Sequence, residues 1–209
     1  MKLTQSERKK IYGTIFSELI SGNYKRIPIP LEDVCARHGI RLTPLARFVC
    51  ESGFSYREAL ALLHNEDGCS ARYTDAQGRQ RYCIIYNDGP NHATRKRFTI
   101  AEELMHIFLG HHMCDIYKLD NPQAWHLPTY EKHEEAARIG AGLLVCVPSV
   151  FFEKPEFFNM NDIRHFFDIS ETCAFTRYEI FTRYKYEIVS HPLYARLKAR
   201  YSWRDVKFD

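Results

Sequence analysis

A largely apolar segment, residues 98–110, constrains the fold more than any other because its acidic and histidine residues have a fixed spacing. Glu102 and His106 are four positions apart, so their side chains share one face of a helix. Two side chains at this spacing can bind one metal ion, and the residue after the first, Glu103, can then reach a metal-bound water as a general base. The segment therefore predicts a helix over Thr99–Gly110 that carries a candidate metal site.

This pattern differs at one position from the zinc-binding form, H-E-x-x-H. Residues 102–106 read E-E-L-M-H, so the first ligand position holds a carboxylate. A structural alternative is open, in which Thr99 and Glu102 form a capping box at the start of the helix. Glu103 would then lie on a solvated face and His106 at the edge of the core. These five residues alone do not decide between the two interpretations.

Composition and charge exclude several classes of protein. The 209 residues are 45% hydrophobic and 26% charged, with a net charge of +3, as in ordinary globular proteins rather than in disordered or strongly nucleic-acid-binding ones. The polar first ten residues lack a secretory signal, and no apolar run is long enough to span a bilayer, so a cytoplasmic protein without membrane association is predicted. Seven cysteines without a C-x-x-C pair are interpreted as reduced and buried, with a thiol nucleophile as the minor alternative.

Local patterns predict an α+β fold with a small antiparallel sheet. Two strand-like runs, residues 70–74 and 81–86, flank turn-forming residues and predict a hairpin, and residues 40–50 are predicted to be extended. Apolar periodicity, capping residues and proline or glycine boundaries predict helices at residues 6–21, 30–39, 55–63, 99–110, 131–147, 162–167 and 171–186. The last two have helix-turn-helix spacing.

Five segments, in order over residues 27–183, resemble the ImmA/IrrE family of metallopeptidases. They are Ile27-Pro28-Ile29-Pro30-Leu31 through Ile40, the strand Ile84-Ile85-Tyr86-Asn87-Asp88, the lead-in Arg97-Phe98-Thr99-Ile100-Ala101, the exit Ile107-Phe108-Leu109-Gly110-His111, and Glu135 through Leu144 followed by Pro148. The last segment is similar to the family's E-A-N-x-F-A-A-x-L-L-M-P helix. The resemblance implies a zincin-like core with an active-site helix, a second ligand-bearing helix and a C-terminal helix-turn-helix-like segment. Residues 1–160 would form the peptidase domain and 161–209 a helical segment packed on it, or the whole chain a single domain.

The resemblance also assigns roles to individual residues. Glu103 stands at the position of the catalytic base, and the metal-ligand positions are those of Glu102, His106 and Glu135. Glu102 replaces the family's first histidine. Met105 stands where glycine is usual and Ala137 where asparagine is usual, so packing around the site is expected to differ from the family pattern.

The altered first ligand changes the expected metal chemistry. Zinc is the ion that the resemblance implies, while two carboxylates and one imidazole also admit manganese or iron. Such a set cancels the charge of a divalent ion and weakens it as a Lewis acid. If the site holds no metal, the clustered carboxylates must take up a proton or recruit another cation. His111 and His133 are possible substitute ligands, the alternative for both being caps and surface contacts.

Three functions follow as hypotheses. The first is a metal-dependent endopeptidase acting on a protein or peptide, with a helix-turn-helix transcriptional repressor as the substrate that the resemblance to these mobile-element proteins implies. The second is a catalytically impaired pseudo-peptidase that acts as an antirepressor or regulatory binding module. The third and weakest is direct DNA binding, since basic and aromatic residues alternate after Cys173. Packing of those aromatic residues in a helical hairpin is the structural alternative.

Overall fold

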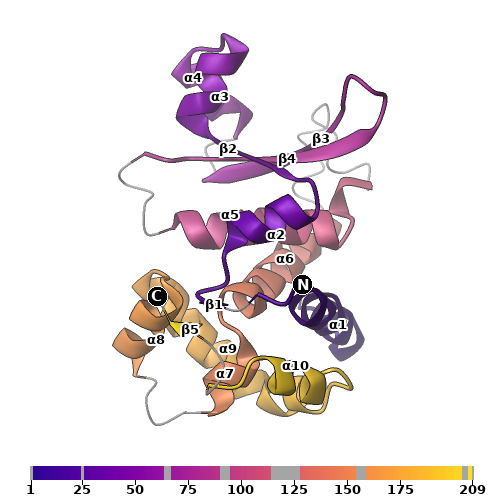
Figure 1. Cartoon of the computed structure of the whole chain (residues 1–209), viewed down its shortest axis with the longest axis vertical. Helices are drawn as coiled ribbons and strands as arrows, with labels where there is room; N and C mark the ends of the chain where they lie inside the picture. The colour runs from indigo at the N-terminus through magenta and orange to yellow at the C-terminus, as the bar shows by residue number, and fades with distance from the viewer. Residues whose placement is uncertain are drawn as a thin grey trace.

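The computed structural model describes residues 2–24, 26–63, 67–89, 95–113, 128–153, 159–203 and 207–208. Within these ranges the chain is a mixed α+β protein, as predicted, with a three-stranded sheet between two groups of helices (Figure 1). None of the described helices is both long and apolar enough to cross a membrane.

The predicted hairpin forms two of the three strands of the sheet. Strands β3 (Gly68–Thr74) and β4 (Gln80–Tyr86) pair antiparallel, with Ser70 opposite Ile84. At the turn between them the Asp75 carboxylate accepts hydrogen bonds from two backbone N–H groups, and Gly78 has a φ of 77°, a conformation that glycine adopts without strain. This turn chemistry is local, which explains why the hairpin could be predicted.

The third strand corrects two predictions. Strand β2 (Arg41–Pro44) pairs parallel to β4, so the sheet is mixed and only the hairpin is antiparallel. The extended conformation predicted for residues 40–50 ends at Pro44, where α3 (Leu45–Ser52) begins. This helix ends at Gly53, whose backbone adopts the left-handed conformation. Helix α4 (Tyr56–Leu62) follows, and it begins with the predicted capping box of Ser55 and Glu58.

Helices α3 and α4 cover one side of the sheet (Figure 1). They do so through a small apolar cluster whose buried residues are Leu45, Ala59 and Leu63. This cluster explains the error at residues 45–50: the apolar residues there, which fit a strand equally well, lie on one face of a helix.

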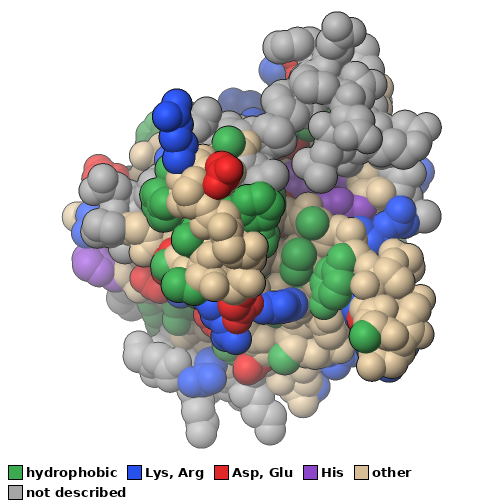
Figure 2. Space-filling view, turned by 90° about the horizontal axis from the view of Figure 1, so that it is seen from above, with side chains coloured by type: hydrophobic (Ala, Val, Ile, Leu, Met, Phe, Trp, Pro, Cys, Tyr) green, Lys and Arg blue, Asp and Glu red, His purple; other side chains and the backbone are tan. Residues whose placement is uncertain are grey.

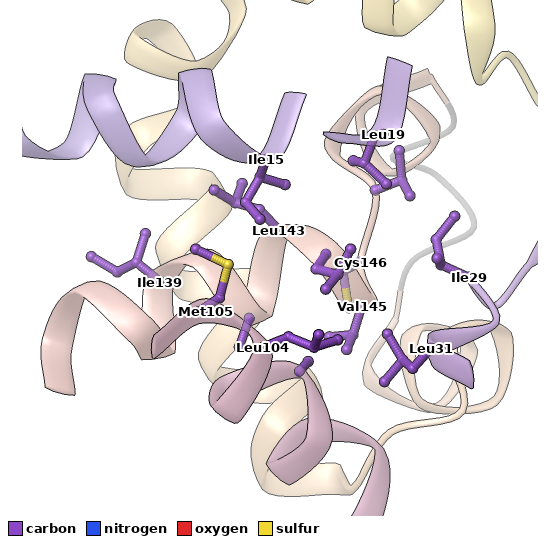
Figure 3. Close-up of a cluster of buried hydrophobic side chains, with 14 of the residues drawn as sticks. Ile15, Leu19, Ile29, Leu31, Leu104, Met105, Ile139, Leu143, Val145 and Cys146 are labelled. Atoms are coloured by element: carbon purple, nitrogen blue, oxygen red, sulfur yellow. The ribbon is translucent and has the colours of Figure 1, made fainter. Parts of the chain in front are cut away.

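The main core lies on the other side of the sheet. There α1 (Gln5–Gly22), α2 (Leu31–Arg37), α5 (Lys96–Phe108) and α6 (Pro128–Val145) pack together. Figure 3 shows side chains from all four helices meeting in one buried cluster, including Ile15, Leu31, Leu104, Met105 and Leu143. A short 3-10 helix, η2 (His111–Met113), follows α5.

The C-terminal part adds four helices to this core, namely α7 (Pro148–Glu153), α8 (Met160–Phe167), α9 (Glu171–Val189) and α10 (Tyr194–Arg200). The predicted pair α8 and α9 is present, joined at Asp168 in the left-handed conformation and with Ser170 capping α9, whereas α7 and α10 were not predicted. The apolar core cluster extends continuously from Leu3 to Tyr201. The domain boundary at residue 160 stays a prediction.

The segment after Tyr184, which has no counterpart in the resemblance, packs on α1. The Arg8 guanidinium pairs with the Glu187 carboxylate at 2.7 Å, and the buried Tyr201 hydroxyl donates to the Leu19 carbonyl at 3.0 Å. A two-stranded parallel pair, β1 (Arg26–Ile27) with β5 (Lys207–Phe208), joins distant parts of the sequence.

The cysteine prediction holds in part. Cys35 and Cys146 are buried and unpaired by disulfides, three others are partly buried, and Cys50 is exposed. Cys114 lies outside the described residues. Burial raises the pKa of the Cys35 and Cys69 thiols to about 12, so these side chains are neutral at physiological pH and are not activated nucleophiles.

Candidate functional site

Two helices carry the predicted site. The residues that meet across their interface show that α5 and α6 run antiparallel, since Glu102 contacts Arg138 while His106 contacts Glu134. Helix α5 begins at Lys96, three residues before the predicted start, and Thr99 is buried inside it. The alternative of a capping box formed by Thr99 and Glu102 is therefore wrong.

Glu102, at the first ligand position, is engaged by an arginine. Its Oε1 accepts a hydrogen bond from Nε of Arg138 at 3.1 Å, and its side chain is 22% exposed. The same guanidinium approaches Glu134, with Nη2 at 3.8 Å from Oε2. A positive charge thus lies between two carboxylates that come from different helices.

Glu103, at the position of the base, points toward the sheet. The Ser70 hydroxyl of β3 donates to its Oε2 at 2.6 Å, and the Ser70 oxygen lies 2.9 Å from Nε2 of His112. Because a hydroxyl has only one proton and gives it to the carboxylate, it accepts from the imidazole N–H. Burial, reinforced by the nearby charges of Glu102 and Glu134, raises the pKa of Glu103 to about 8 despite the Ser70 hydrogen bond.

His106, at the second ligand position, is buried between an acidic and a histidine side chain. Its Nε2 lies 3.5 Å from Oε1 of Glu134, and its Nδ1 lies 3.0 Å from Nδ1 of His111. Burial above all, and then the neighbouring His112, lowers the pKa of His106 to about 3. Burial likewise lowers the pKa of His111 to about 3. Both rings are neutral at physiological pH, which allows one nitrogen of the pair to donate and the other to accept.

The two possible substitute ligands lie beside His106. The rings of His106 and His111 meet edge to face with centroids 4.9 Å apart, and those of His111 and His133 are stacked at 4.2 Å and 10°. The lone pair of an imidazole nitrogen lies in the plane of its ring, so two nearly parallel stacked rings cannot both direct a lone pair at one ion. The prediction requires only one of them to replace the missing imidazole, and that role stays a prediction. Figure 2, seen from the side of α3 and α4, shows a group of histidine side chains near the upper centre and another histidine apart from it at the left edge.

Glu135, the predicted third ligand, occupies another face of α6 than the residue that contacts His106. It is partly buried, and it forms no hydrogen bond or ion pair with any other residue that the structure describes. The carboxylate facing His106 is that of the preceding residue, Glu134, and one position along a helix turns the side-chain direction by about 100°. The role of Glu135 as a ligand stays a prediction.

Comparison with known proteins identifies the family. A profile of the IrrE N-terminal-like domain, a peptidase family (Peptidase M78), matches residues 35–174. The chain belongs to this family. Searches of curated proteins and of solved structures found no match.

Membership in the IrrE N-terminal-like peptidase family implies a metal, and the donor groups can be tested for their fit to one. Among the described ranges, no group of three or more His, Cys, Asp or Glu side chains is arranged to hold a metal ion. The carboxylate of Glu102 is paired with the guanidinium of Arg138, and the two ring nitrogens of His106 face Glu134 and His111. In this arrangement the residues at the ligand positions do not fit a divalent metal ion.

The family departure at Met105 is compensated on the facing helix. A Cβ atom at Gly140 of α6 would lie 2.2 Å from Cε of Met105, so the methionine fills a notch that exists because residue 140 lacks a side chain. The family's pattern has small residues at both positions, glycine on the first helix and alanine on the second. Ala137 is fully buried in the same interface. Packing at this interface therefore differs from the family pattern, with Met105 filling the space beside Gly140.

Three residues of this site were not predicted, namely Ser70, Glu134 and Arg138. Glu134 and Arg138 carried a visible signal, because opposite charges at i and i+4 pair on a helix. Ser70 carried none, since it reaches Glu103 from a strand that lies apart from it in the sequence.

Proposed function

We propose that this member of the IrrE N-terminal-like family is a pseudo-peptidase, which acts as a protein-binding module and does not hydrolyse peptides through a metal-bound water. The observation that carries this proposal is the ion pair of Arg138 with Glu102 at the first ligand position, with 3.1 Å between Nε and Oε1. At the base position, the carboxyl of Glu103 accepts a hydrogen bond from Ser70, and burial raises its pKa to about 8. Burial thus favours the protonated form of Glu103, and in that form the group cannot take a proton from an attacking water.

The first ligand position supports the same proposal. The family's histidine is replaced by Glu102, whose carboxylate pairs with Arg138. Losing a histidine ligand weakens both metal retention and the acidity of a bound water. The first ligand is thus altered in this chain, while the base position keeps its glutamate, which is held by Ser70.

The binding partner that we propose is a helix-turn-helix transcriptional repressor, which makes the chain an antirepressor of a mobile genetic element. This partner comes from the family resemblance, in which such repressors are the substrates. A domain that retains the family fold but has lost hydrolysis can still recognise the same protein and sequester it.

The endopeptidase remains the second candidate because the histidines of the site are uncharged. Burial lowers the pKa of His106 to about 3 and that of His112 to about 4, and neutral imidazole is the form that binds metal ions. Zinc, manganese or iron would then be the cofactor, and rearrangement of the side chains would have to precede binding.

One experiment separates the two candidates. The purified protein is mixed with a candidate repressor, and complex formation and cleavage are followed in the presence of zinc or of a chelator, for the unaltered chain and for Glu103→Gln. We expect a stable complex, an intact repressor and equal affinity in all four conditions. Cleavage that disappears with the chelator and with Glu103→Gln would establish the endopeptidase instead.

A further inference from the structure

The two carboxylates and the histidine at the interface of α5 and α6 are connected through one arginine. Nε of Arg138 lies 3.1 Å from Oε1 of Glu102, Nη2 lies 3.8 Å from Oε2 of Glu134, and Oε1 of Glu134 lies 3.5 Å from Nε2 of His106. The guanidinium therefore stands between the first ligand position of the family motif and an acidic side chain of the facing helix. A cation between two carboxylates stabilises both in their charged form.

A second arginine supports the same turn of α6. Arg177 of α9 is 3% exposed and donates from Nη1 to the backbone carbonyl of Arg138 at 3.2 Å. It reaches this carbonyl because residue 142 is glycine: a Cβ atom there would lie 1.7 Å from Nη1 of Arg177. The buried charge of Arg177 also attracts Glu102. Glu102 thus has one guanidinium in direct contact and another within electrostatic range.

We propose that the guanidinium of Arg138 replaces the metal ion of the family as the cation of this site. It neutralises Glu102 and Glu134, joins α5 to α6, and occupies the carboxylate that stands at the first ligand position. This inference rests on the proposed loss of metal-dependent hydrolysis. It names Arg138 as the residue that makes the loss permanent, because restoring the first histidine alone leaves Arg138 paired with Glu134.

The exposure of the groups makes the proposal testable without unfolding the protein. The Arg138 side chain is 62% exposed, while those of Glu102 and Glu134 are 22% and 19% exposed. Ion pairs of such accessible groups contribute little to stability, so replacing Arg138 should leave the fold intact. Replacing Arg138 removes this cation from both carboxylates, so that an added divalent ion no longer competes with it.

The test measures zinc and manganese binding by isothermal titration calorimetry and bound metal by elemental analysis after dialysis against a metal-free buffer. The proteins are the unaltered chain, Glu102→His, Arg138→Gln and the double variant. Arg183→Gln, on the exposed face of α9, is the control because it removes the same charge away from the site.

We expect no retained metal in the unaltered chain or in Arg183→Gln. The double variant should bind about one zinc ion per chain, at least tenfold more tightly than Glu102→His. If Glu102→His does not fold, Arg138→Gln alone decides, with manganese binding expected to be at least tenfold tighter than in the unaltered chain. Equal affinities in either comparison overturn the proposal, as does zinc retained by the unaltered chain and lost in His106→Ala.

These outcomes are separate from those of the proposed function. Zinc retained by an unaltered chain that forms a complex with the repressor without cleaving it would end the role of Arg138 and leave the binding module standing. Cleavage of the repressor would end the binding module whatever Arg138→Gln does to metal affinity.

Discussion

Replacing Glu103 by glutamine should make the protein more stable, and increasingly so as the pH rises. The folded-state pKa of Glu103 is about 8, against an ordinary value of 4.5, so the folded chain holds a proton that the unfolded chain releases. The stability that Glu103 contributes is therefore fully present below pH 4.5 and is lost as the pH rises toward 8. A glutamine at this position is neutral at every pH, so the variant loses no stability through this group as the pH rises.

The size of the effect follows from the same two values. The difference of 3.5 between 8 and 4.5 corresponds to roughly 5 kcal/mol at about 1.4 kcal/mol per pH unit. Partial access of water to the side chain reduces this figure, and we expect a gain of about 2–4 kcal/mol for Glu103→Gln at pH 8 relative to pH 5.

The assay is urea unfolding at intervals between pH 5 and pH 9 in the presence of a chelator, with Glu179→Gln on the exposed face of α9 as the control for loss of a charge. Groups common to all the proteins cancel in the difference between variant and unaltered chain. A difference between Glu103→Gln and the unaltered chain that stays constant across this pH range would refute the reasoning, because Glu103 would then be ionised in the folded protein at neutral pH and available as a base.

Three further predictions concern the surroundings of the site. Ser70→Ala removes a hydrogen bond that lowers the pKa of Glu103, so the fall in stability measured by urea unfolding should begin at the same pH, which the unfolded chain sets, and continue to higher pH than in the unaltered chain. Gly142→Ala places a Cβ atom 1.7 Å from Nη1 of the buried Arg177, and it should lower the free energy of unfolding by about 3 kcal/mol or more in the same assay. Gly140→Ala meets only the flexible side chain of Met105 and should lower it by about 1–2 kcal/mol. Tyr201→Phe loses the hydrogen bond to the Leu19 carbonyl and should lower the free energy of unfolding by about 1 kcal/mol.

Elements specified by neighbouring residues could be predicted from the sequence. The hairpin, the capping box at Ser55 and the cap at Ser170 each depend on groups within a few positions of one another. The parallel pairing of β2 with β4 could not be predicted, because it joins strands separated by two helices and a third strand. The same apolar residues after Pro44 satisfy a helix or a strand, and only contact with α4 and the sheet decides between them.

The candidate site was predicted by position but not by contact. Glu102, Glu103 and His106 lie on the expected helix, with Arg138 paired to Glu102. The raised pKa of Glu103 has burial as its main cause, so the expected response of crowded carboxylates stays a prediction. Which face of α6 meets α5 depends on the rotation of the whole helix. Glu134 and Glu135 are neighbours in the sequence, so their side chains differ in direction by about 100° around the helix. The pattern of apolar residues does not determine the rotation of the helix so finely.

The hydrogen bond from Tyr201 to Leu19 spans 182 positions along the chain. On the ribosome, the first helix emerges long before the residues that will cover it, and its apolar face must wait for them. Contacts between such distant positions slow folding because a long loop has to close before they form. We therefore expect the nascent chain to depend on chaperones until synthesis of this last segment is finished.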